Sequence, residues 1–373
     1  EHESLVLQGV RAALADGWGG SMIASEVSDV LFRSPHWVRS QANLGILEPD
    51  CVNIVVHGHE ATLSEMIVAA AQSKELLDYA KEKGAQGINL GGICCTANEI
   101  LMRHGISLLG NFLQQELAIA TGVVDAMVVD VQCIFPSIGE LSHKYHTEFI
   151  STSPKARFDF AQHIEFDETR GLEIAKQIVR AAVDAFPKRN QRACVPDLKT
   201  PLVAGFTAEN IHTMLGGRYR PSYRPLNDGV MTGRLRGVVA IVGCNNPKMV
   251  HDTSHVAMAK ELLANDVLVA VTGCSAVADA KAGLLMPEAA EEHGGQGIQE
   301  ICRAVGIPPV LHLGSCVDIS RILTVLSNMV KEGGLGDSIA DLPVAGAAPE
   351  WMSEKAVAIG FYVVGSGVFT VLG

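Results

Sequence analysis

Several features of nucleic-acid-binding proteins are missing from this sequence. The 373 residues contain no run of basic residues and no basic patch interleaved with aromatic residues, and their formal net charge is -12. Binding to a phosphate backbone is dominated by Lys and Arg, so we expect no nucleic-acid partner. Charged residues make up only 19% of the chain and hydrophobic residues 48%, which indicates that an unusually large part of it is buried.

The spacing C-x-x-C is also absent, although the chain contains nine cysteines. This absence argues against zinc ribbons and ferredoxin-type cluster loops. The chain does not start with a basic segment followed by an apolar one, so no signal peptide is expected. We therefore predict a cytoplasmic protein whose cysteines are thiols or metal ligands rather than disulfides, and any metal site must be assembled from distant segments.

Residues 356–373 form an apolar stretch of about the length that a membrane span needs. Three glycines, Gly360, Gly365 and Gly367, interrupt it among Val and Phe residues. This composition favours two short buried strands over a lipid-facing helix, so we expect no membrane span.

From residue 52 onward, Val- and Ile-rich segments alternate with segments of helical periodicity, which predicts an α/β fold with doubly covered, mostly parallel sheets. The expected strands are 52–56, 87–91, 126–131, 238–242, 267–271, 310–313 and 361–364. The expected helices are 63–83, 97–104, 113–121, 254–265 and 318–331.

The length of the chain suggests two or three domains. The turn-rich segment 216–237 is interpreted as a domain boundary, and residues 1–35 are expected to be helical and then irregular, with a glycine-rich interruption at 14–20. The predicted division is a helical N-terminal remnant at 1–36, a middle domain at 37–232 and a C-terminal domain at 233–373.

The stretch Gly91 to Glu99 places two thiols, Cys94 and Cys95, directly after an expected strand. Thr96 and Glu99 have the spacing of a capping box, which predicts a helix beginning there. Ligands of open α/β sheets are held at the carboxyl ends of the strands, so this stretch is a candidate ligand site.

Five cysteines share this position after an expected strand, namely Cys95, Cys133, Cys244, Cys274 and Cys316. A single cysteine is more often a small buried hydrophobe than a ligand. Five in one topological position, several of them beside glycine, indicate a common site instead, and the turn His57-Gly58-His59 closes another strand. Five thiols and a histidine exceed the needs of one tetrahedral zinc, so they favour a polynuclear cluster. The remaining thiols Cys51, Cys194 and Cys302 are assigned to packing.

The motifs VHGHE, GGICCTANEILMRHGI, GNFLQQELAIATG, VVDVQC, VGCNNPK, VTGC, GSCVD and EWMSEKAVAIG occur in this order. Together they make nearly the whole chain similar to the catalytic subunit of the anaerobic nickel–iron carbon monoxide dehydrogenases, including the form that partners acetyl-CoA synthase. The resemblance implies two Rossmann-like domains, with a short helical N-terminal segment, that share a Ni-4Fe-4S cluster in a homodimer. It also implies additional 4Fe-4S relay clusters in an N-terminal part whose cysteines do not occur in this sequence.

The resemblance assigns the cluster ligands residue by residue. His59 and Cys95 match ligands of a pendant iron, Cys133, Cys244 and Cys274 match ligands of the other irons, and Cys316 matches a ligand on the nickel side. His57 remains an alternative to His59, and Cys94 an alternative to Cys95.

The resemblance also implies the reaction, which is the oxidation of CO with water to CO2, two protons and two electrons, and its reverse. Lys355 matches a cation that stabilises the developing carboxylate, Ile359 matches an apolar residue beside the nickel, and Asp16 matches an acidic member of the proton network. The implied partners are CO, CO2 and water, an electron acceptor such as a ferredoxin, a second copy of the chain and, in one form, an acetyl-CoA synthase subunit.

Two other functions are weighed against this one. Hybrid-cluster proteins, which reduce small nitrogen compounds, use a glutamate among their ligands, whereas Cys95 and the motif VGCNNPK favour the dehydrogenase. A non-catalytic scaffold or truncated subunit is the third interpretation, because the relay cysteines do not occur and the sequence begins and ends within expected elements. The presence of nickel, the electron acceptor and the working direction stay open at this point.

Overall fold

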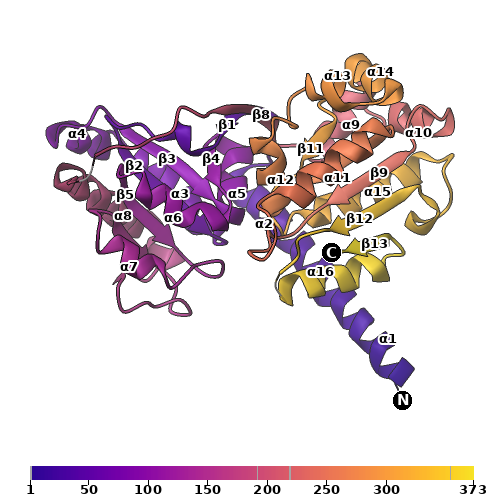
Figure 1. Ribbon diagram of the computed structural model, residues 1–373. Coiled ribbons are helices and arrows are strands. Elements are labelled where there is room, and N and C mark those ends of the chain that lie inside the picture. Colours follow the sequence, from indigo (N-terminus) through magenta and orange to yellow (C-terminus); the bar gives the residue numbers. More distant parts are fainter. Residues whose placement is uncertain (1, 191, 218–219, 353) are drawn as a thin grey trace. The chain divides into compact units, whose positions relative to one another are not determined.

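The computed structural model describes residues 2–190, 192–217, 220–352 and 354–373. The chain forms two compact units. The terminal unit consists of Glu1–Arg39 and Pro201–Gly373, and the middle unit consists of Ser40–Thr200. Each unit is built on a sheet with helices packed against it (Figure 1).

The sheet of the middle unit has the strand order β7-β6-β5-β2-β3-β4-β1-β8, and the chain passes between the units within β1 and β8. Its strands are β1 (Val38–Ala42), β2 (Val52–Gly58), β3 (Ile88–Ile93), β4 (Ser107–Gly110), β5 (Val124–Val129), β6 (Glu148–Ser151), β7 (Gln162–His163) and β8 (Thr200–Ala204). The pairings from β1 to β7 are parallel. Starting at β2, the chain adds β3 and β4 on one side and then β5, β6 and β7 on the other. The winding therefore reverses between β2 and β5, as in a doubly wound dinucleotide-binding sheet.

One face of this sheet is covered by apolar helices. The helices of the middle unit are α3 (Ala61–Ala71), α4 (Lys74–Glu82), α5 (Cys94–His104), α6 (Gln115–Ala120), α7 (Ile138–Ser142) and α8 (Gly171–Ala185). The alternating residues Val52, Ile54 and Val56 of β2 pack in one core with Ile67 of α3 and Ile178 of α8. Because the side chains of a strand alternate between its faces, this alternation defines which face the helices cover.

The sheet of the terminal unit has the order β11-β10-β9-β12-β13, and its pairings are all parallel. Its strands are β9 (Gly237–Ile241), β10 (Val267–Val271), β11 (Val310–His312), β12 (Val344–Ala348) and β13 (Phe369–Leu372). The winding reverses between β9 and β12. The two doubly wound parallel sheets confirm the predicted fold class.

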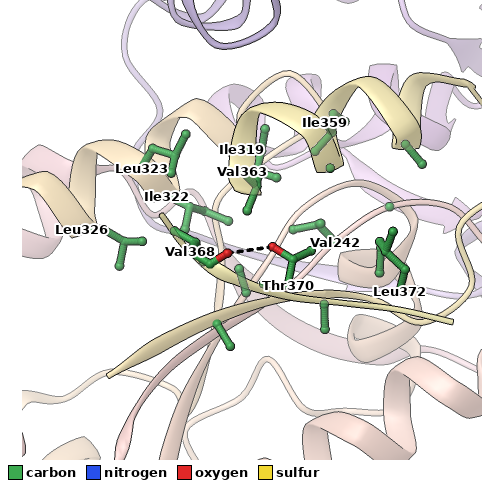
Figure 2. Close-up of a pocket in the computed structure, with 18 residues that line it drawn as sticks. Val242, Ile319, Ile322, Leu323, Leu326, Ile359, Val363, Val368, Thr370 and Leu372 are labelled. Atoms are coloured by element: carbon green, nitrogen blue, oxygen red, sulfur yellow. Dashed lines mark hydrogen bonds between the residues drawn. The ribbon is translucent and has the colours of Figure 1, made fainter. Parts of the chain in front are cut away.

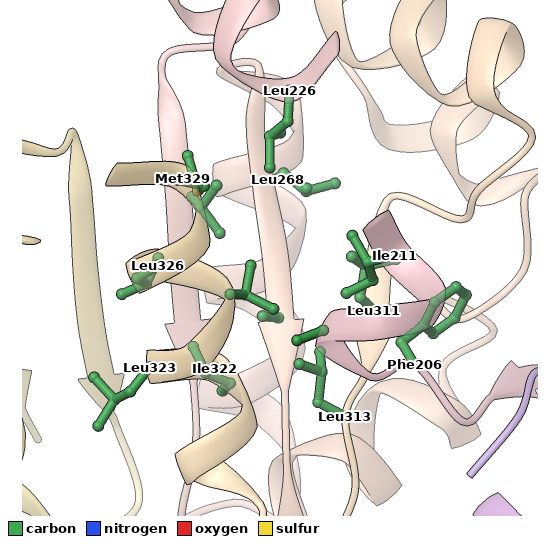
Figure 3. Packing of buried hydrophobic residues seen from close by; sticks show 14 of the residues in the cluster. Phe206, Ile211, Leu226, Leu268, Leu311, Leu313, Ile322, Leu323, Leu326 and Met329 are labelled. Atoms are coloured by element: carbon green, nitrogen blue, oxygen red, sulfur yellow. The ribbon is translucent and has the colours of Figure 1, made fainter. Parts of the chain in front are cut away.

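Helices before and after these strands complete the terminal unit. They are α9 (Ala208–Gly216), α10 (Arg224–Met231), α11 (Thr253–Ala264), α12 (Gly273–Lys281), α13 (Ala289–His293), α14 (Gln296–Val305), α15 (Ile319–Glu332) and α16 (Glu354–Gly365). Figure 3 shows Ile322 and Leu326 of α15 in the same core as Ile211 of α9, Leu268 of β10 and Leu311 of β11.

The N-terminal segment is helical from α1 (His2–Ala12) through the π-helix Ala13–Gly19 to α2 (Gly20–Phe32). Residues 14–20 are therefore helical, and the prediction that they interrupt the helix is wrong. Glycine is needed at position 17 because a Cβ atom there would lie 2.6 Å from the ring of Tyr362 in α16. Close packing against α16, rather than a turn, accounts for this glycine.

The predicted boundary segment 216–237 contains the helix α10 over Arg224–Met231, so the prediction of a turn-rich linker is wrong for this part of it. Tyr223 and Leu226 lie in the core of the terminal unit, with Ile211 of α9. Packing therefore groups residues 201–232 with the terminal unit, whereas the sequence assigns them to a middle domain at 37–232. The division into domains stays a prediction.

Two local predictions are overturned. Residues 361–364 lie in α16 instead of a strand, since the burial of Tyr362 and Val363 in the helix outweighs the strand preference of the Val-rich sequence. Helix α5 begins at Cys94, so Thr96 is inside the helix and does not cap it. In the described part of the chain, no helix is both long and apolar enough to cross a membrane.

Candidate metal centre

Three of the predicted ligands, His59, Cys133 and Cys244, follow strands that flank the reversal of a winding, and the other three, Cys95, Cys274 and Cys316, follow strands further to one side. In the middle unit, β2 is followed by His59 and β5 by Cys133, and Cys95 follows β3. In the terminal unit, Cys244, Cys274 and Cys316 follow β9, β10 and β11. The carboxyl ends of the strands beside such a reversal are where doubly wound sheets bind their ligands.

His59 and Cys133 face each other in the middle unit. The Nε2 atom of His59 lies 3.8 Å from the Sγ atom of Cys133. A tetrahedral metal with ordinary bond lengths to nitrogen and sulfur holds these two atoms about 3.6 Å apart. The two side chains therefore point to one place, where both can reach a metal cluster whose different irons the assignment above gives them, and imidazole with thiolate suits iron, nickel and zinc.

His57 has a different role from its neighbour. Its side chain is fully buried, and its Nε2 donates a hydrogen bond to the carbonyl oxygen of Cys133 over 2.9 Å. Burial lowers the pKa of His57 and so favours the neutral imidazole. His57 thus holds the main chain of Cys133, which supports His59 as the ligand of the pair.

The backbone around the thiols of the middle unit is strained. Gln132 and Cys133 have φ angles of 61° and 58°, and Cys94 has a φ angle of 65°. Non-glycine residues in this left-handed region each cost about 1 to 3 kcal/mol and persist where the surroundings determine them. The side chain of Gln115 donates to the carbonyl oxygen of Cys133 over 3.1 Å and adds to the hydrogen bond from His57.

Cys94 and Cys95 lie in the first turn of α5. Cys94 is 1% exposed and Cys95 is 6% exposed. The carbonyl oxygen of Cys94 accepts a hydrogen bond from Asn98, and Gly58 forms an isolated parallel bridge with Cys94. Cys94 is thus tied to the backbone of its surroundings, and Cys95 remains the predicted ligand.

In the terminal unit, the segments of Cys274 and Cys316 meet at Gly273. A Cβ atom at Gly273 would lie 2.6 Å from the Sγ atom of Cys316, and the φ angle of Gly273 is +66°. The N–H of Gly273 also donates to the carbonyl oxygen of Gly314 over 2.9 Å. Glycine is therefore needed here twice, for its backbone conformation and for the approach of the thiol.

Asp16, Cys316 and Ile359 line one cavity of about 270 Å³ in the terminal unit. They come from the π-helix, the loop after β11 and helix α16. The structure thus brings together three residues that the sequence assigns to one site although they lie far apart in the chain. Lys355 belongs to the first turn of α16, and its side chain lies outside the described part of the structure.

Ile359 also lines a second, apolar cavity. Figure 2 shows it beside Ile319 and Val363, with Val242 and Leu372 on the other side of the cavity. The polar side chain of Thr370 is turned to its own strand, where its hydroxyl donates to the carbonyl oxygen of Val368. Ile359 therefore separates an apolar interior from the cavity beside Cys316.

A buried polar network that the sequence interpretation missed holds the segment of Cys244. The carboxylate of Glu350 accepts hydrogen bonds from the Asn245 side chain over 3.0 Å and from the N–H of Ser254 over 3.1 Å. His255 donates from Nε2 to the carbonyl oxygen of Cys244 over 2.9 Å, and burial lowers its pKa. The only signal in the sequence was the polar pair that follows Cys244, Asn245 and Asn246, in the motif VGCNNPK.

Across the residues that the structure describes, no three His, Cys, Asp or Glu side chains form a group that could hold one metal ion. The predicted ligands come together as the pair His59 and Cys133 in one unit and as the neighbouring segments of Cys274 and Cys316 in the other. The complete set of six stays a prediction.

Comparison with known proteins shows the family of the chain. The family model described as Prismane/CO dehydrogenase matches residues 1–373. The chain belongs to the Prismane/CO dehydrogenase family. Carbon monoxide dehydrogenase 1 of Methanosarcina mazei is 58% identical over 370 residues, which are 99% of this chain and 58% of that protein.

Solved structures of the family superimpose closely on the chain. Carbon monoxide dehydrogenase IV from Carboxydothermus hydrogenoformans gives a TM-score of 0.95 at 46% identity, over 99% of this chain and 60% of that one. The nickel-free, as-isolated carbon monoxide dehydrogenase from Thermococcus sp. AM4, produced without the CooC maturase, gives a TM-score of 0.95 at 51% identity. The match covers 100% of this chain and 58% of that one. The chain thus spans less than two thirds of the length of these relatives.

Proposed function

We propose that the chain forms the catalytic part of an anaerobic carbon monoxide dehydrogenase, which oxidises CO with water to CO2, two protons and two electrons and also runs in reverse. The observation that carries this proposal is the cavity in which Cys316 meets Asp16 and Ile359. It lies beside the strand ends of a chain whose relatives are named carbon monoxide dehydrogenases.

The cofactor in this proposal is a Ni-4Fe-4S cluster with His59, Cys95, Cys133, Cys244, Cys274 and Cys316 as ligands. The His59–Cys133 separation of 3.8 Å and the thiol-sized space above Gly273 support this donor set. When bound, such a cluster supplies a metal that binds CO through carbon and a metal that lowers the pKa of water. Additional 4Fe-4S relay clusters are proposed for an N-terminal part whose cysteines do not occur in this sequence.

The side chains of the cavity support the chemistry in separate ways. Ile359, with its apolar neighbours, excludes bulk water from the side of the thiol, which strengthens electrostatic interactions there. Asp16 is exposed and lines the same cavity, so its carboxylate can take up a proton from the site and release it to solvent. Lys355, one turn before Ile359 in α16, is proposed as the cation that stabilises a developing carboxylate.

The proposed partners follow from the same family. A relative from Moorella thermoacetica, 45% identical, is named as subunit beta of carbon monoxide dehydrogenase/acetyl-CoA synthase. We propose a homodimer in the cytoplasm that passes electrons to an acceptor such as a ferredoxin, with an acetyl-CoA synthase subunit as a further partner. The thiol-rich donor set supports a reducing compartment.

Metal analysis of anaerobically purified protein tests the proposal, with Cys316→Ala compared against Cys302→Ala. Cys302 is an equally buried thiol in α14 that belongs to the apolar core, so it is the matched control. We expect nickel and CO-dependent viologen reduction in the parent protein and in Cys302→Ala, and a loss of both in Cys316→Ala. Absence of nickel from the parent protein, or retention of nickel in Cys316→Ala, contradicts the proposal.

The same measurements separate the alternatives. Full metal occupancy without reduction of viologen by CO supports a non-catalytic scaffold. Reduction of small nitrogen compounds without nickel supports a reductase of the hybrid-cluster type.

A further inference from the structure

We propose that Asp130 is the positioning residue that fixes the imidazole of His59 toward Cys133. Asp130 directly follows β5, and it belongs to the motif VVDVQC without a role assigned to it so far. The inference rests on the proposed function only in that it takes His59 as a metal ligand.

The carboxylate of Asp130 holds the main chain of the His59 turn. The N–H of His59 donates to both of its oxygens, each over 2.8 Å. The N–H of Glu60 donates to Oδ2 over 2.7 Å, and the N–H of Val131 donates to Oδ1. Asp130 is only 2% exposed, so these hydrogen bonds form where water does not compete for the carboxylate.

Gly58 makes this contact possible. Its φ angle is +145°, and a Cβ atom there would lie 2.0 Å from Oδ1 of Asp130. The close approach requires glycine between the two histidines. Strands β2 and β5 are parallel neighbours with His57 paired to Val129, so the turn and the carboxylate are placed opposite each other by the sheet itself.

The residue after Asp130 completes the arrangement. The Nδ1 atom of His59 lies 2.8 Å from the carbonyl oxygen of Val131. A carbonyl oxygen only accepts, so Nδ1 carries the proton, and in the neutral ring Nε2 is then the nitrogen with a lone pair. Nε2 is the atom that lies 3.8 Å from Sγ of Cys133. Asp130 and Val131 therefore determine both the position and the tautomer of the imidazole, as groups around metal-bound histidines commonly do.

The test compares Asp130→Asn with Asp125→Asn. Asparagine replaces one acceptor oxygen with an NH2 donor, which faces backbone N–H donors and cannot hold the turn. Asp125 is an equally buried aspartate near the start of the same strand, where it accepts from the N–H of Asn53 over 2.7 Å and pairs with Arg189. Its substitution perturbs a buried carboxylate without touching the His59 turn.

The first readout uses the metal-free chain, in which the ¹⁵N chemical shifts of the His59 imidazole report the tautomer. We expect a single Nδ1–H tautomer in the parent chain and in Asp125→Asn, and a mixture in Asp130→Asn. The second readout is the affinity for iron, measured by competition with a chelator, which we expect to fall about 10- to 100-fold in Asp130→Asn alone.

A structural role of Asp130 without positioning lowers the melting temperature but leaves the tautomer and the iron affinity unchanged, and this result overturns the proposal. If Asp130→Asn does not fold, Asp130→Ser retains one small acceptor and is measured in the same way, with the same result expected. If Asp130→Asn loses the single Nδ1–H tautomer of His59 but the parent protein never acquires nickel, the positioning role is supported and the proposed function is contradicted. Failure of the proposal and failure of the proposed function are thus distinguishable.

Discussion

His57 donates a hydrogen bond from Nε2 to the carbonyl oxygen of Cys133 over 2.9 Å, whereas His59, two residues later, directs its Nε2 to the thiol of the same cysteine over 3.8 Å. One histidine therefore supports the main chain of the cysteine, and the other faces its sulfur. Cys133 has a strained φ angle of 58°, which its surroundings must hold. The hydrogen bond from His57 to its carbonyl oxygen therefore helps to keep its thiol in front of His59.

Substitution of the two histidines by alanine separates these roles. We expect His57→Ala to lower the free energy of unfolding by about 2 to 4 kcal/mol, because it leaves a cavity and removes the donor to a strained segment. His59→Ala is expected to change it by less than about 1 kcal/mol, since the side chain is only half-buried. Iron content is expected to fall in His59→Ala. Unfolding in denaturant and metal analysis measure the two effects, and equal iron content in His59→Ala and the parent protein contradicts the assignment.

The adjacent thiols give a second comparison. Cys95→Ala is expected to lose iron, whereas Cys94→Ala is expected to retain it and to lose stability, because Cys94 is the more deeply buried of the two and its main chain is bridged to Gly58. Metal analysis after anaerobic purification measures the difference. If Cys94→Ala removes the metal and Cys95→Ala does not, the order of the two cysteines is reversed.

Arg321 joins the N-terminal helix α2 to the start of α15. Its guanidinium bonds both oxygens of Asp29, over 2.8 and 2.9 Å, and Oδ1 of Asp318 over 2.7 Å. Asp318 is only 1% exposed, so Arg321→Ala deprives a buried carboxylate of its cation and is expected to cost about 3 to 5 kcal/mol of unfolding free energy.

Arg303→Ala is the matched control for Arg321→Ala. Arg303 pairs with Glu291 on the surface, where the two side chains are 70% and 66% exposed. Exposed ion pairs contribute about 0 to 1 kcal/mol, so little loss is expected. Similar losses in the two variants, measured by denaturant unfolding, contradict the role assigned to Arg321.

Asp279, in α12, makes the stability of the chain depend on pH. Its side chain is fully buried, and neither carboxyl oxygen has a hydrogen-bond partner among the described residues. Burial raises its pKa well above 3.8, with the nearby charge of Asp252 adding to the effect. The folded state therefore binds the proton more tightly than the unfolded state. Its stabilising contribution is complete below about pH 3.8 and is lost as the pH rises toward the folded-state pKa.

Asp279→Asn removes this pH dependence. The free energy of unfolding of the variant, relative to the parent chain, is expected to grow with pH by at most about 1.4 kcal/mol per unit up to the folded-state pKa. Urea unfolding at several pH values between about 4 and 8 checks it. A difference that stays constant over this range contradicts the prediction.

Cys302 and Cys194 are expected to differ in reactivity. Burial raises the pKa of Cys302 to about 12, whereas Cys194 is exposed, so the sequence-based assignment of Cys194 to packing is wrong. Because the thiolate is the nucleophile, alkylation by iodoacetamide near pH 8 is expected to be at least about 100-fold slower at Cys302. Peptide mass spectrometry measures the two rates, and comparable rates contradict the burial of Cys302.

Much of the fold could be predicted because its elements are encoded locally. Valine- and isoleucine-rich strands such as β5 and β10 follow from their composition, and the helix expected at 318–331 is α15. Two of the predictions that failed, at 14–20 and 361–364, concern segments whose conformation is decided by contact between them. Gly17 packs on Tyr362, and neither segment contains any local sign of the other.

For the candidate site, the sequence by itself determined which residue types follow the strands, and therefore that thiols and a histidine gather at the carboxyl edges of two parallel sheets. Only the tertiary structure decided which histidine faces a thiol and that Asp130 holds the main chain of His59. It also decided that the absence of a side chain at Gly273 leaves room for the thiol of Cys316. The physical reason is that strand order and side-chain direction depend on contacts between residues far apart in the chain. His59 and Asp130 are separated by 71 residues and are brought together by the pairing of β2 with β5.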